Sequence, residues 1–234
     1  MKTHRWNITL ACLALCIGFV LFIIVREVIL RRQTADRAAR VKAATLMIND
    51  FWNNFPESAN ISPTGSAESI SSWRFRVLCT LRHHPVKPQL DAPWNATANQ
   101  YYFRMCPVEF CRPRDPHTCI VAITGAGTPF NRGGRNLSTK LPPATIMIVE
   151  RKQSLTHWME PADLELTTIA TMIPRTAQLG ADEGDPHSFF VGFADNSIWR
   201  LSNDVPMETL LHFATADGAK SHDRDQELRP YRVR

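Results

Sequence analysis

The 234-residue sequence lacks the short motifs that mark several large enzyme classes. It has no HExxH pair of zinc-binding histidines, no G-x-S-x-G nucleophile turn and no Walker lysine motif, so the chemistry that those motifs support is not indicated. The stretch "TGAGTPF" (124–130) contains two glycines but no third glycine at the spacing of a dinucleotide-binding turn. It therefore predicts a loop, and no cofactor is expected.

The main body of the chain also lacks an excess of positive charge. Lys and Arg outnumber Asp and Glu by 27 to 22, but residues 1–42 hold 8 of the cations and only 2 of the acids, which leaves 19 against 20 for residues 43–234. A protein that binds a nucleic-acid duplex carries its basic face on the folded domain. We therefore expect no nucleic acid among the partners.

One long apolar run is present, and it carries no charge over residues 8–25, "ITLACLALCIGFVLFIIV". Lys2 and Arg5 precede it and Arg26 follows it, and its length fits a membrane-spanning helix. A cleaved signal peptide is the alternative, but the run is long and "REVILRRQ" follows it without a small-x-small cleavage site. The sequence therefore predicts a flank (1–7) and an uncleaved transmembrane helix (8–25), with the lipid bilayer as a partner.

Glycine and proline are absent from residues 26–54, which are rich in the good helix formers Ala, Arg, Leu and Lys. Apolar residues recur there at steps of three and four, which is typical of a helix with one buried face. These residues are Ala44, Met47, Ile48, Phe51 and Phe55. We expect the transmembrane helix to continue through residues 26–55 and to pack on a soluble domain.

Residues 56–219 are predicted to form one α+β head domain, which begins with a linker at 56–66. The strand candidates are residues 101–105, 119–123, 144–150, 188–194 and 197–201. The helix candidates are 71–81, 161–173 with Pro161 in its first position, and 205–215 with Asp204 as its cap. Most connections are too short for repeated parallel crossovers, so the sheet should be mainly antiparallel. The polar residues 220–234 predict a disordered tail.

Asp195 and Asn196 separate two β-rich runs near the end of the head. Two residues between such runs predict a tight hairpin in which both have positive φ, a conformation that Asp and Asn tolerate. A calcium-binding loop is the alternative, in which Asp195 joins Asp182, Glu183 or Asp185 from the preceding acidic loop. The turn is the favoured interpretation.

Four cysteines lie in the head, at Cys79, Cys106, Cys111 and Cys119. Two disulfides would use all four thiols, and three pairings are compatible with the sequence. Free thiols are one alternative. A zinc site is another, because Cys106, Cys111, His117 and Cys119 place four possible ligands within fourteen residues, although not at the spacing of a standard zinc knuckle. Disulfides are favoured.

Three carboxylates lie where either acid–base chemistry or structure would explain them. Glu150 ends an apolar strand candidate, and Glu160 and Asp163 flank Pro161 at a predicted helix start, where carboxylates offset the helix dipole. An acid and base pair is the alternative. The structural role is favoured, so the sequence predicts no enzyme and no catalytic residue.

The charges around the apolar run and the cysteines indicate opposite orientations in a membrane. Two cations precede the run and six follow it by residue 42, so the positive-inside rule places the body in the cytoplasm. The even set of cysteines favours an oxidising compartment instead. These two observations leave the orientation open.

Eight short segments occur in order along residues 20–219. They are "ADRAARVKAATLMINDFWNNFP", "SWR", "DAPWN", Cys106-Pro107, "TGAGTPF", "IMIVE", "WMEPADL" and "FADNS". This order resembles the prepilin-like "H-x9-DG" family of planctomycete bacteria, a domain of unknown function once labelled a bacterial solute-binding family. The chain departs from that family in four places: it lacks the Gly and Glu of a prepilin processing site, Cys119 stands where an aromatic residue is common, His187 lies only eight residues before Asp195, and Asn196 replaces a Gly.

The resemblance implies a pseudopilin-like fold, in which the long N-terminal helix packs on a mainly antiparallel sheet. It implies a single-pass protein of the cytoplasmic (inner) membrane whose C-terminal domain faces outward. The expected role is structural or interactive, with other pseudopilin-like or envelope proteins as partners. An extracytoplasmic module that binds a small solute or a metal ion is the alternative.

Overall fold

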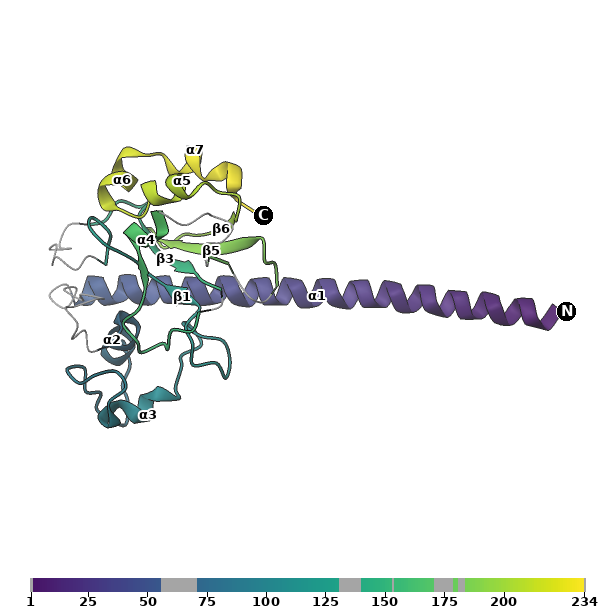
Figure 1. Cartoon of the computed structure of the whole chain (residues 1–234), viewed down its shortest axis with the longest axis horizontal. Coiled ribbons are helices and arrows are strands. Elements are labelled where there is room, and N and C mark those ends of the chain that lie inside the picture. Colours follow the sequence, from purple (N-terminus) through teal and green to yellow (C-terminus); the bar gives the residue numbers. More distant parts are fainter. Residues whose placement is uncertain are drawn as a thin grey trace.

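The computed structural model describes residues 2–55, 71–130, 140–152, 154–170, 179–180 and 184–233, with side chains from residue 15 onward. Figure 1 shows one long helix that projects from a smaller head, with the strands and the other helices gathered around the C-terminal half of that helix. The α+β class with a long N-terminal helix is confirmed. The predicted linker (56–66) lies outside the described residues.

Helix α1 (Lys2–Asn54) continues without a break for 53 residues, a length of about 80 Å at the usual rise per residue. The prediction of one continuous helix is therefore confirmed. In its second half one stripe is buried, at spacings of three and four residues that keep it on a single face. The stripe consists of Arg37, Val41, Ala44, Thr45, Ile48 and Phe51. Phe55 follows the helix and is 37% exposed, so it lies outside the stripe.

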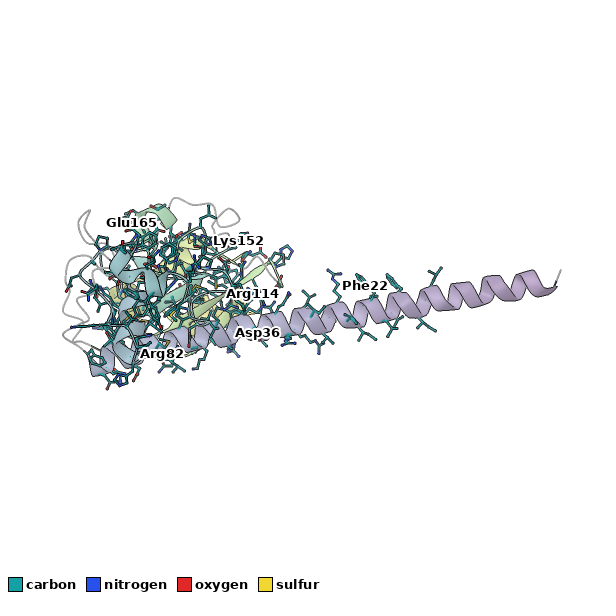
Figure 2. The ribbon with its side chains drawn as sticks, turned by 90° about the horizontal axis from the view of Figure 1, so that it is seen from below. Phe22, Asp36, Arg82, Arg114, Lys152 and Glu165 are labelled. Carbon is teal, nitrogen blue, oxygen red and sulfur yellow. A yellow bond between two sulfur atoms is a disulfide. The ribbon has the colours of Figure 1, made fainter. Side chains whose placement is uncertain are left out.

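The N-terminal half of α1 extends beyond the head. Figure 2 shows Phe22 on this projecting part, whereas Asp36 lies where the head begins. Within the described part of the chain, no helix combines the length and the hydropathy that a membrane span needs. The side chains of residues 8–14, which begin the predicted span, are not among those described.

Four strands form an antiparallel sheet in the order β1-β3-β5-β6. They are β1 (Ile120–Val121), β3 (Ile146–Glu150), β5 (Ser188–Phe193) and β6 (Ile198–Ser202). Each neighbouring pair is antiparallel, which confirms the predicted sheet type. The central strands β3 and β5 are buried along their whole length, as expected for strands that are covered on both faces.

Alternating side chains of β5 divide the core into two layers. Phe190 belongs to the core that includes α1, whereas Phe189 and Val191 belong to the core that includes the C-terminal helices. In Figure 1 α1 lies along one side of the sheet. The C-terminal helices α5 (Met207–His212), α6 (Ala216–Ser221) and α7 (Arg224–Glu227) lie over the other side (Figure 1). At Gly192 a Cβ atom would overlap the Thr45 hydroxyl and lie 3.2 Å from the Thr45 Cβ. A glycine at this position therefore lets α1 approach β5 closely.

Residues 194–197 connect β5 to β6, and the hydrogen bond between Phe193 and Ser197 closes a three-residue loop, 194–196. The Phe193 amide donates to the Ser197 carbonyl, and the Asn196 amide donates to the Phe193 carbonyl, both at 3.0 Å. Asn196 has a φ of 65°, whereas Asp195 is not among the residues with positive φ. Such loops combine a type I turn with one left-handed residue. The predicted hairpin is confirmed, but the two-residue turn with positive φ at Asp195 is wrong.

A second, parallel pair of strands lies where part of a helix is predicted. Strand β2 (Ile123–Thr124) pairs with β4 (Leu164–Glu165), and helix α4 (Leu166–Ala170) follows directly. The predicted helix from Pro161 therefore starts five residues too early, because the Leu164 amide bonds to the Ala122 carbonyl at 3.1 Å. Residues 171–173 of that prediction are outside the described part.

Helices α2 (Trp73–Leu81) and α3 (Gln100–Phe103) lie on one side of α1, and the sheet and helices α5 to α7 lie on the opposite side (Figure 1). Helix α2 is capped by the Ser72 hydroxyl, which accepts from the Phe75 amide, and it confirms the helix predicted at 71–81. Helix α3 follows the turn η2 (Thr97–Asn99). The strand predicted at 101–105 is therefore wrong. Its aromatic composition suits a strand, but Tyr102 is buried against Phe75, and tertiary packing of this kind overrides strand propensity.

The C-terminal residues form a folded layer instead of the predicted disordered tail (220–234). Helices α5 (Met207–His212), α6 (Ala216–Ser221) and α7 (Arg224–Glu227) are followed by the turn η3 (Arg229–Tyr231). The layer is held by burial of Leu228 and by the Arg224 guanidinium, which lies over the rings of Phe193 and Trp199 at 4.6 and 4.8 Å. The residue before α5 is Pro206, and no side chain caps this helix, so the predicted cap at Asp204 is also wrong.

Candidate functional site

The four head cysteines form one disulfide rather than two. Cys106 and Cys111 are bonded to each other, whereas Cys79 and Cys119 are free. The disulfide closes a short loop of the head. All four residues are described, so the prediction of a second disulfide among them is wrong.

The alternative zinc site at these cysteines is incompatible with the observed bonding. Cys106 and Cys111 are consumed by their disulfide, and a zinc-binding cysteine must be a thiolate. His117 directs its Nδ1 atom to the Asp115 carboxylate, 2.8 Å away. The four residues therefore do not provide a tetrahedral set of ligands.

Both free thiols of the head are poor nucleophiles. Burial raises the pKa of Cys79 to about 12. Burial also raises the pKa of Cys119, although the Arg40 guanidinium, whose Nη1 lies 3.2 Å from the sulfur, acts in the opposite direction. Since thiolates are the reactive form, a catalytic role for either cysteine is not supported.

Glu150 is part of a buried ion pair between α1 and the sheet. Its carboxylate accepts from Arg37 Nε at 2.9 Å and Nη2 at 2.8 Å, and from the Phe190 amide at 3.2 Å. Arg37 also donates to the Ser188 carbonyl at 2.9 Å. Both charged side chains are at most 3% exposed. The pair fixes the rotation of α1 on the sheet.

Asp163 is part of a second buried ion pair, centred on α2. Arg74 Nη1 donates to it at 2.7 Å, and both side chains have no exposed surface. The guanidinium also donates to the carbonyls of Trp158, Glu160 and Ala162. The Glu160 carboxylate accepts from the His157 amide at 3.2 Å. These carboxylates are engaged in structural bonds, but Glu160 and Asp163 do not begin a helix as predicted, because α4 starts at Leu166.

The loop at Asp195 and Asn196 is docked on α1. The Asn196 carbonyl accepts from Lys42 Nζ at 2.5 Å, and its side-chain oxygen accepts from Asn49 Nδ2 at 2.6 Å. Asp195 accepts from Arg224 at 2.8 Å and from the Ser197 amide at 2.9 Å. Partial burial tends to raise the pKa of Asp195, but the bonds from Arg224 and Ser197 outweigh it and hold the pKa below its usual value.

The alternative calcium loop is not supported by the described acids. Asp185 bonds to Arg200 at 2.7 Å, whereas Asp195 bonds to Arg224, so each carboxylate is paired with a different arginine. Asp182 and Glu183 lie outside the described residues. A structural turn explains Asp195 and Asn196.

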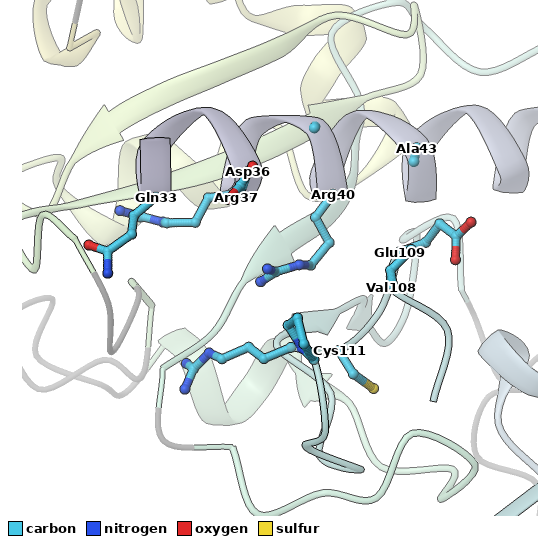
Figure 3. A pocket seen from close by; sticks show the side chains of 11 residues that line it. Gln33, Asp36, Arg37, Arg40, Ala43, Val108, Glu109 and Cys111 are labelled. Carbon is cyan, nitrogen blue, oxygen red and sulfur yellow. The ribbon is translucent and has the colours of Figure 1, made fainter. Parts of the chain in front are cut away.

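A cavity of about 630 Å³ lies between α1 and the segment 108–113. In Figure 3 the Arg40 side chain extends from α1 toward the segment that carries Cys111, with Glu109 at the other end of the opening. Arg112 also lines it. The guanidinium groups of Arg37, Arg40 and Arg112 outnumber the carboxylates of Asp36 and Glu109 in its lining, and this balance of charge suits a small anion better than a neutral apolar ligand.

The sequence did not point to this cavity or to one other cluster of polar side chains. The cavity joins residues about seventy positions apart, and no local motif encodes that contact. The cluster consists of His212, His222 and Glu227, whose ligand atoms lie within 4.8 Å of one another. The predicted tail included two of these residues, although Thr215 and Asp223 precede short helices as N-caps, a signal that the sequence does carry.

Comparisons with known proteins return no relative of this chain. No family model matches it, and no curated protein or solved structure is similar to it.

Proposed function

We propose that this protein is a single-pass, membrane-anchored structural or interaction protein of the cell envelope, similar to a pseudopilin and without catalysis. The observation that supports this most directly is the division of α1 into two halves. The C-terminal half is packed in the head, whereas the projecting half exposes large apolar side chains to its surroundings. A surface of this kind is unfavourable in water.

The exposed apolar side chains surround residues 15–25 of the projecting half on every side. Nine of the residues from 15 to 25 are large, apolar and at least 49% exposed: Leu15, Ile17, Phe19, Val20, Leu21, Phe22, Ile23, Ile24 and Val25. Consecutive positions of a helix point in all directions, so this segment has no polar face, which is typical of a membrane helix. Their transfer into a bilayer is favourable by about 3 to 5 kcal/mol at 0.3 to 0.6 kcal/mol each.

Charged residues begin where the apolar segment ends. Arg26, Arg31 and Arg32 are exposed on the head side of it, at the depth where lipid phosphates would lie. Cations at this position are attracted to anionic head groups. On the other side, the printed sequence extends the uncharged run back to Ile8.

An orientation with the head outside the cytoplasm is supported by two observations. The Cys106–Cys111 disulfide suits an oxidising compartment, and the segment order resembles outward-facing prepilin-like proteins. Other pseudopilin-like or envelope proteins are the proposed partners, because exposed stems of single-pass proteins can pack against one another in a bilayer.

Alkaline carbonate extraction of isolated membranes tests the anchor. The double substitution L15D/L21D places two carboxylates in the projecting half of α1 at a cost of about 5 to 7 kcal/mol. This cost exceeds the favourable transfer free energy of the nine exposed apolar side chains. The matched control is L46D, because Leu46 is an exposed leucine on the head half of the same helix. We expect the wild type and L46D to stay with the membranes and L15D/L21D to be released.

Release of the wild type by carbonate would contradict the anchor, as would equal retention of L15D/L21D. Protease treatment of intact spheroplasts tests the orientation separately. Digestion of the head from outside is expected, and full protection would place the head in the cytoplasm.

Binding of a small anion is the second candidate function, because of the cavity lined by Arg40 and Arg112. Thermal unfolding with citrate or phosphate tests it, with R40Q as the variant. A melting temperature that rises with the anion in the wild type, but not in R40Q, would support this role. If the anion leaves the melting temperature of both proteins unchanged, the anion-binding role is wrong and the structural role stands alone.

A further inference from the structure

We propose that His212, His222 and Glu227 form a binding site for a divalent metal ion of the zinc class. His212 Nδ1 lies 2.9 Å from Glu227 Oε2, and His222 Nδ1 lies 2.7 Å from Glu227 Oε1. The two imidazole rings are stacked, with 3.7 Å between their centroids and 22° between their planes. Both Nδ1 atoms therefore face a single carboxylate.

The three side chains come from three different helices that the fold holds together. His212 is the last residue of α5, His222 follows α6 as its C-cap, and Glu227 is the last residue of α7. Gly218 makes this arrangement possible, because a Cβ atom there would overlap the carbonyl oxygen of His212. A glycine at this point lets α6 cross the end of α5 at backbone distance.

The donor set fits zinc chemically. Two imidazoles and one carboxylate are ligands that zinc takes at about 2.0 to 2.2 Å. Two atoms bound to one such ion in tetrahedral geometry are about 3.4 Å apart, so the two Nδ1–carboxylate distances of 2.9 and 2.7 Å need to lengthen by about 0.5 to 0.7 Å. The ligand atoms all lie within 4.8 Å of one another, so the remaining pair needs to close by at most about 1.4 Å.

The site is open to solvent on one side. The three side chains are 31%, 34% and 27% exposed, so an ion can enter without unfolding the layer. Three protein ligands leave a fourth tetrahedral position for water or for a group of another molecule. The site is independent of the proposed membrane anchor, since none of its residues lies on α1.

A bound ion would stabilise the C-terminal layer by linking the ends of its helices. In the metal-free state the same atoms form two hydrogen bonds from histidine to Glu227, which is the competing explanation of the cluster. The two explanations predict different responses to zinc, because added zinc stabilises the folded protein only if the three side chains bind it.

Zinc titration of the full chain in detergent micelles tests the site, with a chromophoric chelator as competitor. We expect one tight zinc ion per chain. H212Q, H222Q and E227Q should each weaken its binding about a hundredfold or more, since even the loss of an outer partner of a metal ligand costs tenfold to a hundredfold. The matched control is H83Q, because His83 is an exposed histidine elsewhere on the head, and its affinity should equal that of the wild type.

Two measurements on the unaltered chain keep the test valid if a variant fails to fold. Zinc should raise the melting temperature of the wild type. X-ray absorption of the zinc-loaded wild type should show imidazole nitrogen and oxygen ligands and no sulfur. Sulfur ligation, which would point to the free cysteines, overturns the proposal. An affinity in folded H212Q equal to that of H83Q, or no tight zinc in the wild type, also overturns it.

Discussion

Removal of Arg37 from its buried pair with Glu150 should destabilise the protein strongly. In R37M the carboxylate loses both of its guanidinium donors and keeps one bond, from the Phe190 amide. Both side chains are at most 3% exposed, so water cannot replace the lost donors. Leaving one member of a buried pair uncompensated costs about 3 to 5 kcal/mol. Urea unfolding of the full chain in micelles, followed by tryptophan fluorescence, gives the free energy of unfolding.

The same helix offers a matched control in the pair of Arg31 with Glu27. That pair has a similar distance of 2.9 Å, but its side chains are 80% and 54% exposed, and R31M should cost less than about 1 kcal/mol. In R37M/E150L the charges are replaced together, and the loss should fall below the sum of the two single losses. The reasoning is refuted if R37M costs no more than R31M, or if the single losses simply add.

Three further results are expected. G192A should destabilise the head by about 1 to 3 kcal/mol in urea unfolding, because its methyl group would overlap the Thr45 hydroxyl. Adding T45A to G192A should restore part of the lost stability. The control G18A should cost nothing, because a Cβ atom at Gly18 meets no atom within 4 Å. Cys79 should be alkylated by iodoacetamide far more slowly in the folded than in the unfolded chain, because a rise of its pKa from 9.0 to about 12 lowers its thiolate fraction about a thousandfold; equal rates by mass spectrometry would contradict this. D195N should have a lower free energy of unfolding than the wild type at neutral pH. The difference should disappear as the pH falls below about 4, because a carboxyl group with a lowered pKa loses its contribution to stability when it is protonated. A difference that is constant with pH would contradict this prediction.

Residues whose structure is determined by local composition were predicted well. The continuity of α1 follows from the absence of Gly and Pro between residues 26 and 54. Strands β3, β5 and β6 follow from β-branched and aromatic runs that a polar turn separates. In these segments local preference and tertiary environment agree.

The wrong predictions concern segments whose state depends on distant residues. Residues 101–105 have strand-like composition, yet Tyr102 packs on Phe75 of α2. The C-terminal residues are polar, but Arg224 reaches the aromatic rings of β5 and β6 and Leu228 enters the core. The cysteine pairing depends on which thiols the fold brings together, and sequence alone leaves three pairings open.

The most direct test of the central claim measures where the projecting half of α1 lies. A nitroxide attached through a genetically encoded ketone residue at Phe22, and in a second sample at Leu46, leaves the native cysteines unchanged. In proteoliposomes we expect the label at Phe22 to be relaxed by oxygen and protected from a water-soluble nickel complex, and the label at Leu46 to behave in the opposite way, because oxygen concentrates in hydrocarbon. Equal access of the nickel complex to both labels would show that the projecting half of α1 lies in water, and the proposed anchor would be wrong.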